Sequence, residues 1–456
     1  MKTKFEFLVY SFLIFTSLYS CKESGNTSKV NQDEFKNHRP YFTKVIVNDE
    51  NIPQEDKIFL KAEPFVYFET PKELEDWITQ KKSPVVMQGL SELPIVTGVQ
   101  GWRITYQTKD LQGERTNASG LLLIPNDLDY KQPHALVNVL HATITSNYDA
   151  PGQFPKEGLW EAGSGLVVAA PDYLGFGASN HIFHPFLIEK GYQESLADFI
   201  SAIYWLANNK LNLNLDKGLF IKGHSEGGYA TLALQKYLEE IDPSGEKYNL
   251  KAAASSSGPY STFGASQYIL EQDELPSSVL PPYLIISYRE HYKELEETLS
   301  DEICFKNPII RGKNWKHWYS GKYEIEYLTN FIPSQKTELF KPAIAKDLLN
   351  NLQNFNLNSP IVYKLIENDF LAYSSLHNNN KLLFKSKTLF TGCTNDKVVP
   401  SMVLDNLVNM NFDKNSPIEV KLYGEKDMEF KITPEISAHE NCPSIYKSTL
   451  WLKELI

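Results

Sequence analysis

The chain has 456 residues, of which 42% are hydrophobic and 12% aromatic, and it carries a formal net charge of −11. A chain of this length and composition can bury a large core, which excludes an intrinsically disordered protein. No run of the sequence is dense in Lys and Arg, and phosphate neutralisation requires a concentrated basic face. A nucleic-acid partner is therefore not expected.

The first 20 residues, MKTKFEFLVYSFLIFTSLYS, predict a signal peptide. Two lysines precede an apolar stretch from Phe7 to about Tyr19, which is shorter than the roughly 20 residues that a membrane-spanning helix requires. Residues 18–21, Leu-Tyr-Ser-Cys, resemble the lipobox of bacterial lipoproteins, in which cleavage precedes a lipidated cysteine. We therefore expect a lipid anchor on Cys21. The alternative is an ordinary secretory signal with an incidental cysteine.

Residues 21–62 are expected to form a flexible tether and an N-terminal extension, because the stretch after Cys21 is polar and low in apolar residues. An anchored, exported protein belongs to the cell envelope, and we expect the outer membrane. The stretch Lys22, Glu23, Ser24 is similar to the short acidic signals that direct some bacterial lipoproteins to the outer face of the cell.

The rest of the chain, residues 63–456, predicts one α/β domain. Two strand-like runs flank the turn at Asp110–Gly113 and predict an antiparallel hairpin at the edge of a sheet. Continuous apolar runs are typical of strands covered on both faces, and they occupy residues 134–142 and 165–177. Residues 218–225, 251–260, 385–393 and 417–424 predict the further strands of the sheet. Helical spacing of apolar residues predicts helices at 193–206, 228–240 and about 444–455. This alternation favours a mainly parallel central sheet with helices on both faces.

Between residue 262 and about residue 380 the strand pattern stops. The segment is rich in Tyr, Leu, Glu and Lys and reads as mostly helical. It is too long for a structureless loop in a compact domain, so we interpret it as a helical cap inserted over the active site. Its aromatic residues could line an apolar pocket or form the core of the cap; examples are Trp315, Trp318, Tyr319 and Tyr323.

Residues 223–227 read Gly-His-Ser-Glu-Gly and lie between a predicted strand and a predicted helix. A tight strand-to-helix turn strains the backbone of the serine and leaves no room for side chains at the two glycine positions. The first amides of the helix and its dipole would favour a negatively charged oxygen beside the serine. Ser225 is therefore the candidate nucleophile.

The stretch GHSEGGYATLAL, with PDYLGFGAS upstream and TGCTNDKVVP and AHE downstream, resembles the α/β-hydrolase superfamily. The resemblance is greatest to bacterial secreted lipases and esterases with a long helical cap, and it covers the chain from about Gly101 to the C-terminus. It implies the α/β-hydrolase fold and a catalytic triad in the order serine, acid, histidine, with no cofactor.

The resemblance places the acid at Asp396, in the loop after the strand at 385–393, and the base at His439, between the last strand and the final helix. A serine hydroxyl needs such a base, and the base needs a carboxylate to orient it. The competing residues fit less well: Asp405 and Asp413 lie within or after the following helix, and His291, His317 and His377 lie in the cap or at its end.

The oxyanion of an acyl-transfer reaction needs two backbone N–H donors. The resemblance implies that one comes from Glu226 and the other from the loop after the strand at 134–142, where Thr143 is favoured over Ala142. We expect the side chain of Glu226 to face solvent at the start of the helix, His224 to pack against the sheet, and Asp172 to have a structural role rather than serve as a second acid.

Besides Cys21, the chain contains Cys304, Cys393 and Cys442. An exported protein can form a disulfide, and three cysteines allow only one bond. If the loops that carry Asp396 and His439 meet, Cys393 and Cys442 come close and could form that bond; otherwise both are free thiols. No cluster has the spacing of metal ligands, so no metal site is expected.

The sequence predicts a serine hydrolase that cleaves carboxylic esters of a small molecule, a glycan or a lipid. One alternative is a serine exopeptidase or amidase on the same fold. The other, from a different class, is a non-catalytic surface lipoprotein that binds a glycan or lipid. The sequence does not indicate an oligomeric state.

Overall fold

The computed structural model describes residues 45–46, 59–81, 83–377, 380–400, 404–429, 431–432 and 437–456. All of them belong to one compact unit, Lys44–Ile456. The expected signal peptide, Cys21 and most of the expected tether lie outside the described residues. Within the described ranges, no helix is long and apolar enough to cross a bilayer.

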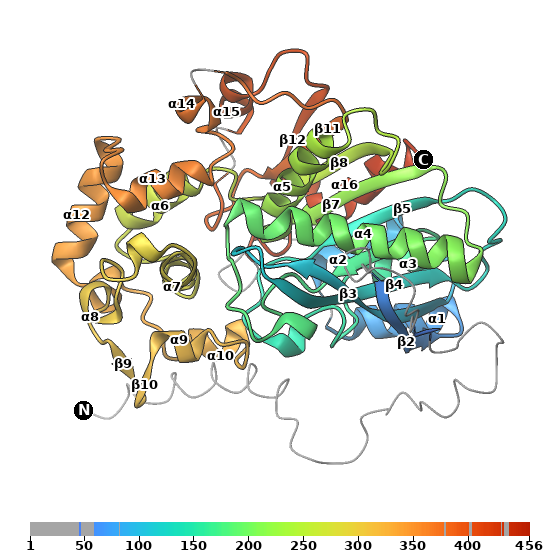
Figure 1. The fold of residues 1–456 in the computed structure, drawn as a ribbon, viewed down its shortest axis with the longest axis horizontal. Coiled ribbons are helices and arrows are strands. Elements are labelled where there is room, and N and C mark those ends of the chain that lie inside the picture. Colours follow the sequence, from blue (N-terminus) through green and yellow to red (C-terminus); the bar gives the residue numbers. More distant parts are fainter. Residues whose placement is uncertain are drawn as a thin grey trace, which may run out of the picture. The chain divides into compact units, whose positions relative to one another are not determined.

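One sheet organises the fold (Figure 1). Its strands within the described residues are β1 (Val45–Ile46), β2 (Phe59–Phe68), β3 (Val99–Lys109), β4 (Arg115–Pro125), β5 (Ala135–Leu140), β6 (Val167–Pro171), β7 (Gly218–His224), β8 (Leu250–Ser256), β11 (Lys387–Cys393) and β12 (Ile418–Tyr423). Their order in space is β1-β2-β3-β4-β6-β5-β7-β8-β11-β12. Neighbours from β6 to β12 are parallel, and neighbours from β1 to β6 are antiparallel. The predicted α/β fold with a mainly parallel sheet is confirmed.

The start of the sheet differs from the expectation in two ways. The hairpin β3–β4 forms around Asp110–Gly113 as predicted, but β2 pairs with the outer side of β3, so the hairpin is not the edge of the sheet. The sheet also begins before residue 63, because β1 and the first residues of β2 come from the stretch expected to be an extension. Two register shifts in the pairing of β2 with β3, one of them beside Pro64, break the period of two that identifies a strand.

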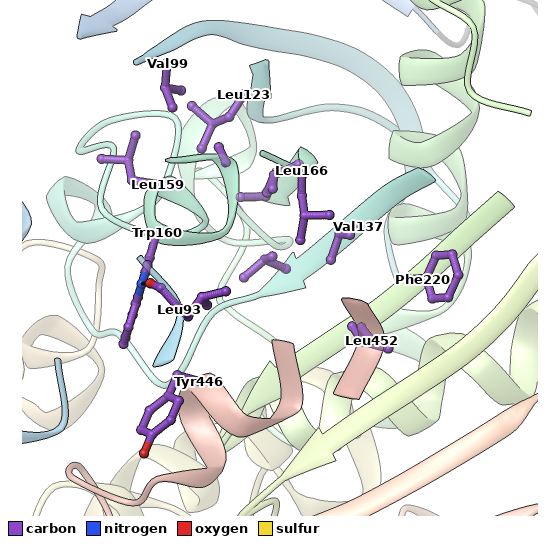
Figure 2. Close-up of a cluster of buried hydrophobic side chains, with 14 of the residues drawn as sticks. Leu93, Val99, Leu123, Val137, Leu159, Trp160, Leu166, Phe220, Tyr446 and Leu452 are labelled. Carbon is purple, nitrogen blue, oxygen red and sulfur yellow. Dashed lines mark hydrogen bonds between the residues drawn. The ribbon is translucent and has the colours of Figure 1, made fainter. Parts of the chain in front are cut away.

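Helices cover both faces of the sheet, as predicted. On one face lie α4 (Glu194–Leu206) and α5 (Glu226–Ile241); on the other lie α1 (Pro71–Ile78), α2 (Pro84–Glu92), α3 (Leu159–Gly163) and α16 (Ser444–Lys453). Figure 2 shows the core on the second face, where Trp160 of α3 and Tyr446 of α16 lie with Val137 of β5 and Phe220 of β7. Alternate residues of β7 point to opposite faces, so the strand is buried on both.

The segment between β8 and β11 is mostly helical, as expected for a cap. Its elements are α6 (Thr262–Glu271), α7 (Leu280–His291), α8 (Asp301–Cys304), β9 (Ile309–Ile310), β10 (Lys313–Asn314), α9 (Trp315–Trp318), α10 (Ile325–Thr329), α11 (Lys336–Leu339), α12 (Pro342–Gln353), α13 (Pro360–Glu367) and α14 (Tyr373–Leu376). After β11, α15 spans Leu404–Asn411. The aromatic side chains of Trp315, Trp318 and Tyr319 are buried in the cap and form its core.

A buried carboxylate ties the two ends of the cap together. Asp369 accepts hydrogen bonds from the Ser261 hydroxyl and the Phe263 amide, which precede and open α6, and from the amides of Leu371 and Ala372. The oxygens lie 2.6 to 3.0 Å from these donors. Burial, partly offset by these bonds, raises the pKa of Asp369 to about 6.

Candidate active site

Ser225 occupies the turn between β7 and α5. Its backbone φ is 58° and its ψ is −122°, a conformation that a residue with a side chain rarely adopts. The Ser225 amide donates to the carbonyl oxygen of Ser256 at the end of β8, 2.9 Å away. The turn therefore projects the serine from the carboxyl edge of the parallel strands.

The two glycines beside Ser225 are required by close approach of the backbone. A Cβ at Gly223 would overlap the carbonyl group of Gly227, and a Cβ at Gly227 would overlap the carbonyl group of Leu140. The space is this small because Gly227 lies against Leu140, the last residue of β5. The structure thus supplies the reason that the sequence pattern suggested for glycine at both positions.

Ser225, His439 and Asp396 form a continuous chain of hydrogen bonds. His439 Nε2 lies 2.8 Å from Ser225 Oγ, and His439 Nδ1 lies 2.7 Å from Asp396 Oδ2. The other oxygen of Asp396 accepts from the amides of Val398 and Val399, each 2.9 Å away. The structure therefore brings together the three residues that the sequence analysis selected from distant segments.

The surroundings of His439 assign its tautomer. A carboxylate only accepts hydrogen bonds, so Nδ1 carries the proton that points to Asp396, and Nε2 offers its lone pair to the Ser225 hydroxyl. Ser225, Asp396 and His439 are 8%, 4% and 9% exposed, so water screens the three groups little. This arrangement can withdraw a proton from the serine oxygen.

The partner of the Ser225 hydroxyl is His439 and not the neighbouring His224. Its ring lies 5.0 Å from the ring of His439, centroid to centroid. Burial first, and then the proximity of His439, lowers the pKa of His224 well below its ordinary value, so His224 is neutral at pH 7.

A disulfide joins the loops that carry the acid and the base. Cys393 and Cys442 are bonded, with their Cα atoms 5.8 Å apart. Cys393 ends β11, shortly before Asp396, and Cys442 lies between His439 and α16. The bond therefore ties the Asp396 loop to the His439 loop. Cys304 is a buried free thiol in the cap.

The candidate oxyanion donors are backbone N–H groups at the start of α5 and in the loop after β5. Glu226 is the first residue of α5, so its N–H has no partner within the helix. Ala142 and Thr143 follow β5, and both line the pocket that contains Ser225. His141, just before them, is held by stacking on Tyr173 with 3.8 Å between ring centroids.

A pocket of about 650 Å³ opens onto Ser225 and His439. The cap contributes Leu275, Leu280 and Ile325 to its wall, and the sheet side contributes Leu140 and Trp160. The volume lies within the range typical of small-molecule sites. Cap and sheet together thus enclose a largely apolar cavity with the serine at its wall.

Two buried charged groups near the site were not anticipated. The expectation that the Glu226 side chain faces solvent is wrong: this side chain is 1% exposed and contacts His184 and Tyr192. Lys222 of β7 is 5% exposed and pairs with Glu161 of α3 at 2.5 Å. Within a single sequence, Glu226 looks like an ordinary surface charge at a helix start, and Lys222 is a single charge within an apolar strand.

Asp172 has the structural environment that was expected of it. One carboxylate oxygen accepts from the Ser119 hydroxyl, and the other accepts from the Gly152 amide at 2.6 Å. Burial raises its pKa, although these hydrogen bonds act in the opposite direction. Among the described residues, no group of His, Cys, Asp and Glu side chains could hold a metal ion.

Known proteins resemble this chain in part of its sequence and in its fold. The sequence profile of the prolyl oligopeptidase family matches residues 153–240, a segment that contains Ser225. The sequence matches no curated protein.

Several solved structures share the fold. A Legionella pneumophila protein provisionally named a hydrolase is 18% identical, with a TM-score of 0.71 over 87% of this chain and 98% of its own. The rice cell wall degrading esterase LipA of Xanthomonas oryzae is 21% identical, with a TM-score of 0.69 over 88% and 98% of the two chains. Candida antarctica lipase A is 14% identical, with a TM-score of 0.53 over 84% and 80%. The chain therefore has the α/β-hydrolase fold.

Proposed function

We propose that the protein is a serine hydrolase that cleaves carboxylic esters, with Ser225 as the nucleophile. The observation that carries this proposal is the chain of hydrogen bonds from Asp396 through His439 to Ser225, at 2.7 and 2.8 Å. Base and nucleophile within hydrogen-bond reach, with the base oriented by a third group, are the signature of an activated serine.

In the proposed mechanism, Ser225 Oγ attacks the carbonyl carbon of the ester while His439 Nε2 takes the hydroxyl proton. The negative charge that develops on the carbonyl oxygen is stabilised by the N–H groups of Glu226 and Thr143. His439 then gives its proton to the leaving alcohol, and an acyl group remains on Ser225. Water, deprotonated by His439, then attacks the acyl group. The bond between the acyl carbon and Ser225 Oγ breaks, His439 returns the proton to Ser225 Oγ, and the carboxylic acid leaves. Asp396 stabilises the positively charged His439 in both steps.

The pocket supports an ester with an apolar part. Leu275, Leu280 and Ile325 of the cap face the same cavity as Ser225, and Leu140 and Trp160 line it from the sheet side. Such a wall suits an acyl chain or an aryl group, whereas the reacting carbonyl lies beside the polar groups of the triad. We infer an ester of a small molecule, a lipid or an acylated glycan.

A second candidate is a peptidase or amidase on the same fold. The match of residues 153–240 to the prolyl oligopeptidase family favours it. A triad of this kind can cleave an ester or an amide, although an amine is a poorer leaving group than an alcohol. The substrate that the pocket accepts therefore decides between the two functions.

A panel of ester and amide substrates distinguishes the two candidates. The panel contains p-nitrophenyl esters of increasing acyl length, feruloyl esters, acetylated glycans and aminoacyl anilides, each tested with the wild-type protein and with Ser225→Ala. The proposal predicts ester hydrolysis that depends on Ser225. Cleavage of anilides alone would favour the peptidase, and no cleavage combined with specific glycan or lipid binding would favour a non-catalytic lipoprotein.

We also propose that the protein is anchored to the outer membrane through lipid on Cys21. The support is the lipobox-like sequence before Cys21 and the polar stretch after it. Growth of expressing cells with an alkyne fatty acid should label the wild-type protein and not Cys21→Ser. Equal labelling of both proteins, or of neither, would exclude the anchor.

A further inference from the structure

The side chain of Glu226 forms a buried cluster directly behind the nucleophile turn. Its Oε1 atom lies 2.8 Å from His184 Nε2 and accepts from the Tyr192 hydroxyl at 2.9 Å. Glu226, His184 and Tyr192 are 1%, 3% and 0% exposed. A carboxyl group therefore lies out of water, on the residue whose backbone N–H is the candidate oxyanion donor.

The hydrogen bonds of His184 fix the number of protons in this cluster. His184 Nδ1 lies 2.7 Å from the carbonyl oxygen of Leu174, which only accepts, so Nδ1 carries a proton. Nε2 faces the carboxyl oxygen of Glu226, and one proton must lie between them. The pair is either an imidazolium with a carboxylate or a neutral imidazole with a carboxylic acid. In both forms the pair as a whole is neutral.

The surroundings of the pair penalise any unbalanced charge. The rings of Phe176 and Tyr283 lie 4.8 and 5.9 Å from the ring of His184, and Tyr173 stacks at 6.1 Å. Tyr192 accepts from the Leu187 amide, so its own hydroxyl proton is directed to Glu226. In so apolar a setting, a carboxylate without its counter-charge is strongly disfavoured.

We propose that His184 and Glu226 are positioning residues for the oxyanion donor at residue 226. The carboxyl group of Glu226 anchors the first turn of α5 to His184 and Tyr192, which fixes the direction of the Glu226 N–H. The proton shared with His184 cancels the charge of this anchor, so that the carboxylate does not repel the oxyanion that forms beside Ser225. This inference rests on the proposed function.

The test is a pair of variants that separates charge from shape. His184→Gln keeps an N–H donor near the position of Nε2 but cannot carry the shared proton, and it leaves Glu226 as an uncompensated carboxylate. We expect kcat for a p-nitrophenyl ester to fall about tenfold or more, with KM changed less than about twofold, since loss of a whole oxyanion donor costs about 10² to 10³. Adding Glu226→Gln to His184→Gln should recover most of this loss, because the neutral amides can hydrogen-bond each other.

Rates are measured per active site titrated with a fluorophosphonate, so that misfolded molecules do not count. The matched control is His181→Gln, an exposed histidine of the same loop that contacts Thr116, and its rates should equal those of the wild type. An unchanged kcat in His184→Gln, or losses that add in the double variant, would overturn the proposal. If wild-type Ser225 is not labelled and Ser225→Ala remains active, the proposed function itself fails, which is a different result.

If His184→Gln does not fold, a comparison of two neutral variants at Glu226 tests the same proposal. Glu226→Gln keeps partners for His184 and Tyr192, whereas Glu226→Leu keeps none. The proposal predicts a higher kcat for the Gln variant at similar KM. Equal kcat values for the two variants would show that the side chain does not position the donor.

Discussion

The buried ion pair between Lys222 and Glu161 connects strand β7 to helices α3 and α16. Lys222 Nζ donates to Glu161 Oε1 at 2.5 Å, to Thr449 Oγ1 at 2.6 Å and to the carbonyl oxygen of Ile445 at 2.9 Å. Lys222 lies three residues before Ser225 on β7, and both α16 partners follow His439. The ammonium group thus joins the strand that delivers the nucleophile to the helix that follows the base.

Lys222→Met should destabilise the protein by about 3–5 kcal/mol, the usual effect of removing one partner of a buried ion pair. Methionine retains most of the apolar stem of the lysine, so the loss comes from the charge and its three hydrogen bonds. Glu161 would remain 7% exposed with no counter-charge. In the wild type, burial acts to raise the pKa of Glu161, but the charge and hydrogen bond of Lys222, together with hydrogen bonds from the Glu161 backbone and Thr449, leave this pKa lowered. The loss would be a large part of the roughly 5–15 kcal/mol by which a protein is stable.

Urea unfolding followed by tryptophan fluorescence measures this loss. Lys222→Met/Glu161→Gln removes the unpaired charge and should recover a large part of the stability. The matched control is Lys72→Met, because Lys72 and Asp76 form an ion pair whose side chains are 84% and 64% exposed; we expect no measurable loss there. Equal destabilisation in the single and double variants, or none in Lys222→Met, would refute the reasoning.

Three further predictions concern the loops, the cap and the nucleophile turn. Cys393→Ser/Cys442→Ser removes a bond between residues separated by 49 positions, and it should lower the free energy of unfolding by about 4 kcal/mol in the chain-entropy model. The rate of ester hydrolysis should fall as well. An unchanged melting temperature and unchanged activity would contradict the role of the disulfide. The pKa of Asp369 is raised from 3.8 to about 6. Its contribution to the free energy of unfolding is therefore full below about pH 4 and is lost as the pH rises through about 6, a change of about 3 kcal/mol. In urea titrations, the stability of the wild type relative to Asp369→Asn should fall over this pH range, and a constant difference would contradict the assignment. Gly227→Ala places a Cβ against the carbonyl group of Leu140, so the turn that holds Ser225 must shift. We expect that Ser225 is then no longer labelled by a fluorophosphonate. Normal labelling would show that the turn is not tightly packed.

Much of the fold could be predicted from the sequence because its strands are continuous apolar runs. Five of the predicted strands, β5, β6, β7, β8 and β11, are buried along most of their length, and burial on both faces favours such apolar runs. The sixth, β12, lies at the edge of the sheet and is only partly buried. Ser225 was recognisable for a similar reason, since close backbone contacts permit only glycine at 223 and 227. Burial of a strand and close backbone contact in a turn each restrict a few consecutive residues, so both can be recognised in the sequence.

What the sequence did not reveal depends on partners distant in the chain. Glu226 looks like an acidic residue at a helix start, which commonly faces solvent, yet His184 lies 42 positions away and covers it. Lys222 interrupts an apolar strand, and its partner Glu161 lies 61 positions away. The strand β2 was not predicted, because its register shifts disrupt the alternation of buried and exposed residues that identifies a strand. Long-range pairing and irregular pairing leave no periodic pattern in one sequence.

The most direct test of the account is the reaction of Ser225 itself. Wild-type protein, Ser225→Ala and His439→Ala are incubated with a fluorophosphonate, the modified residue is located by peptide mass spectrometry, and p-nitrophenyl ester hydrolysis is measured on the same samples. The account predicts that Ser225 of the wild type is labelled and that hydrolysis stops in proportion, while both variants fail to react and hydrolyse at least about 10³ more slowly. Label on another residue, or ester hydrolysis that persists in Ser225→Ala, would contradict it.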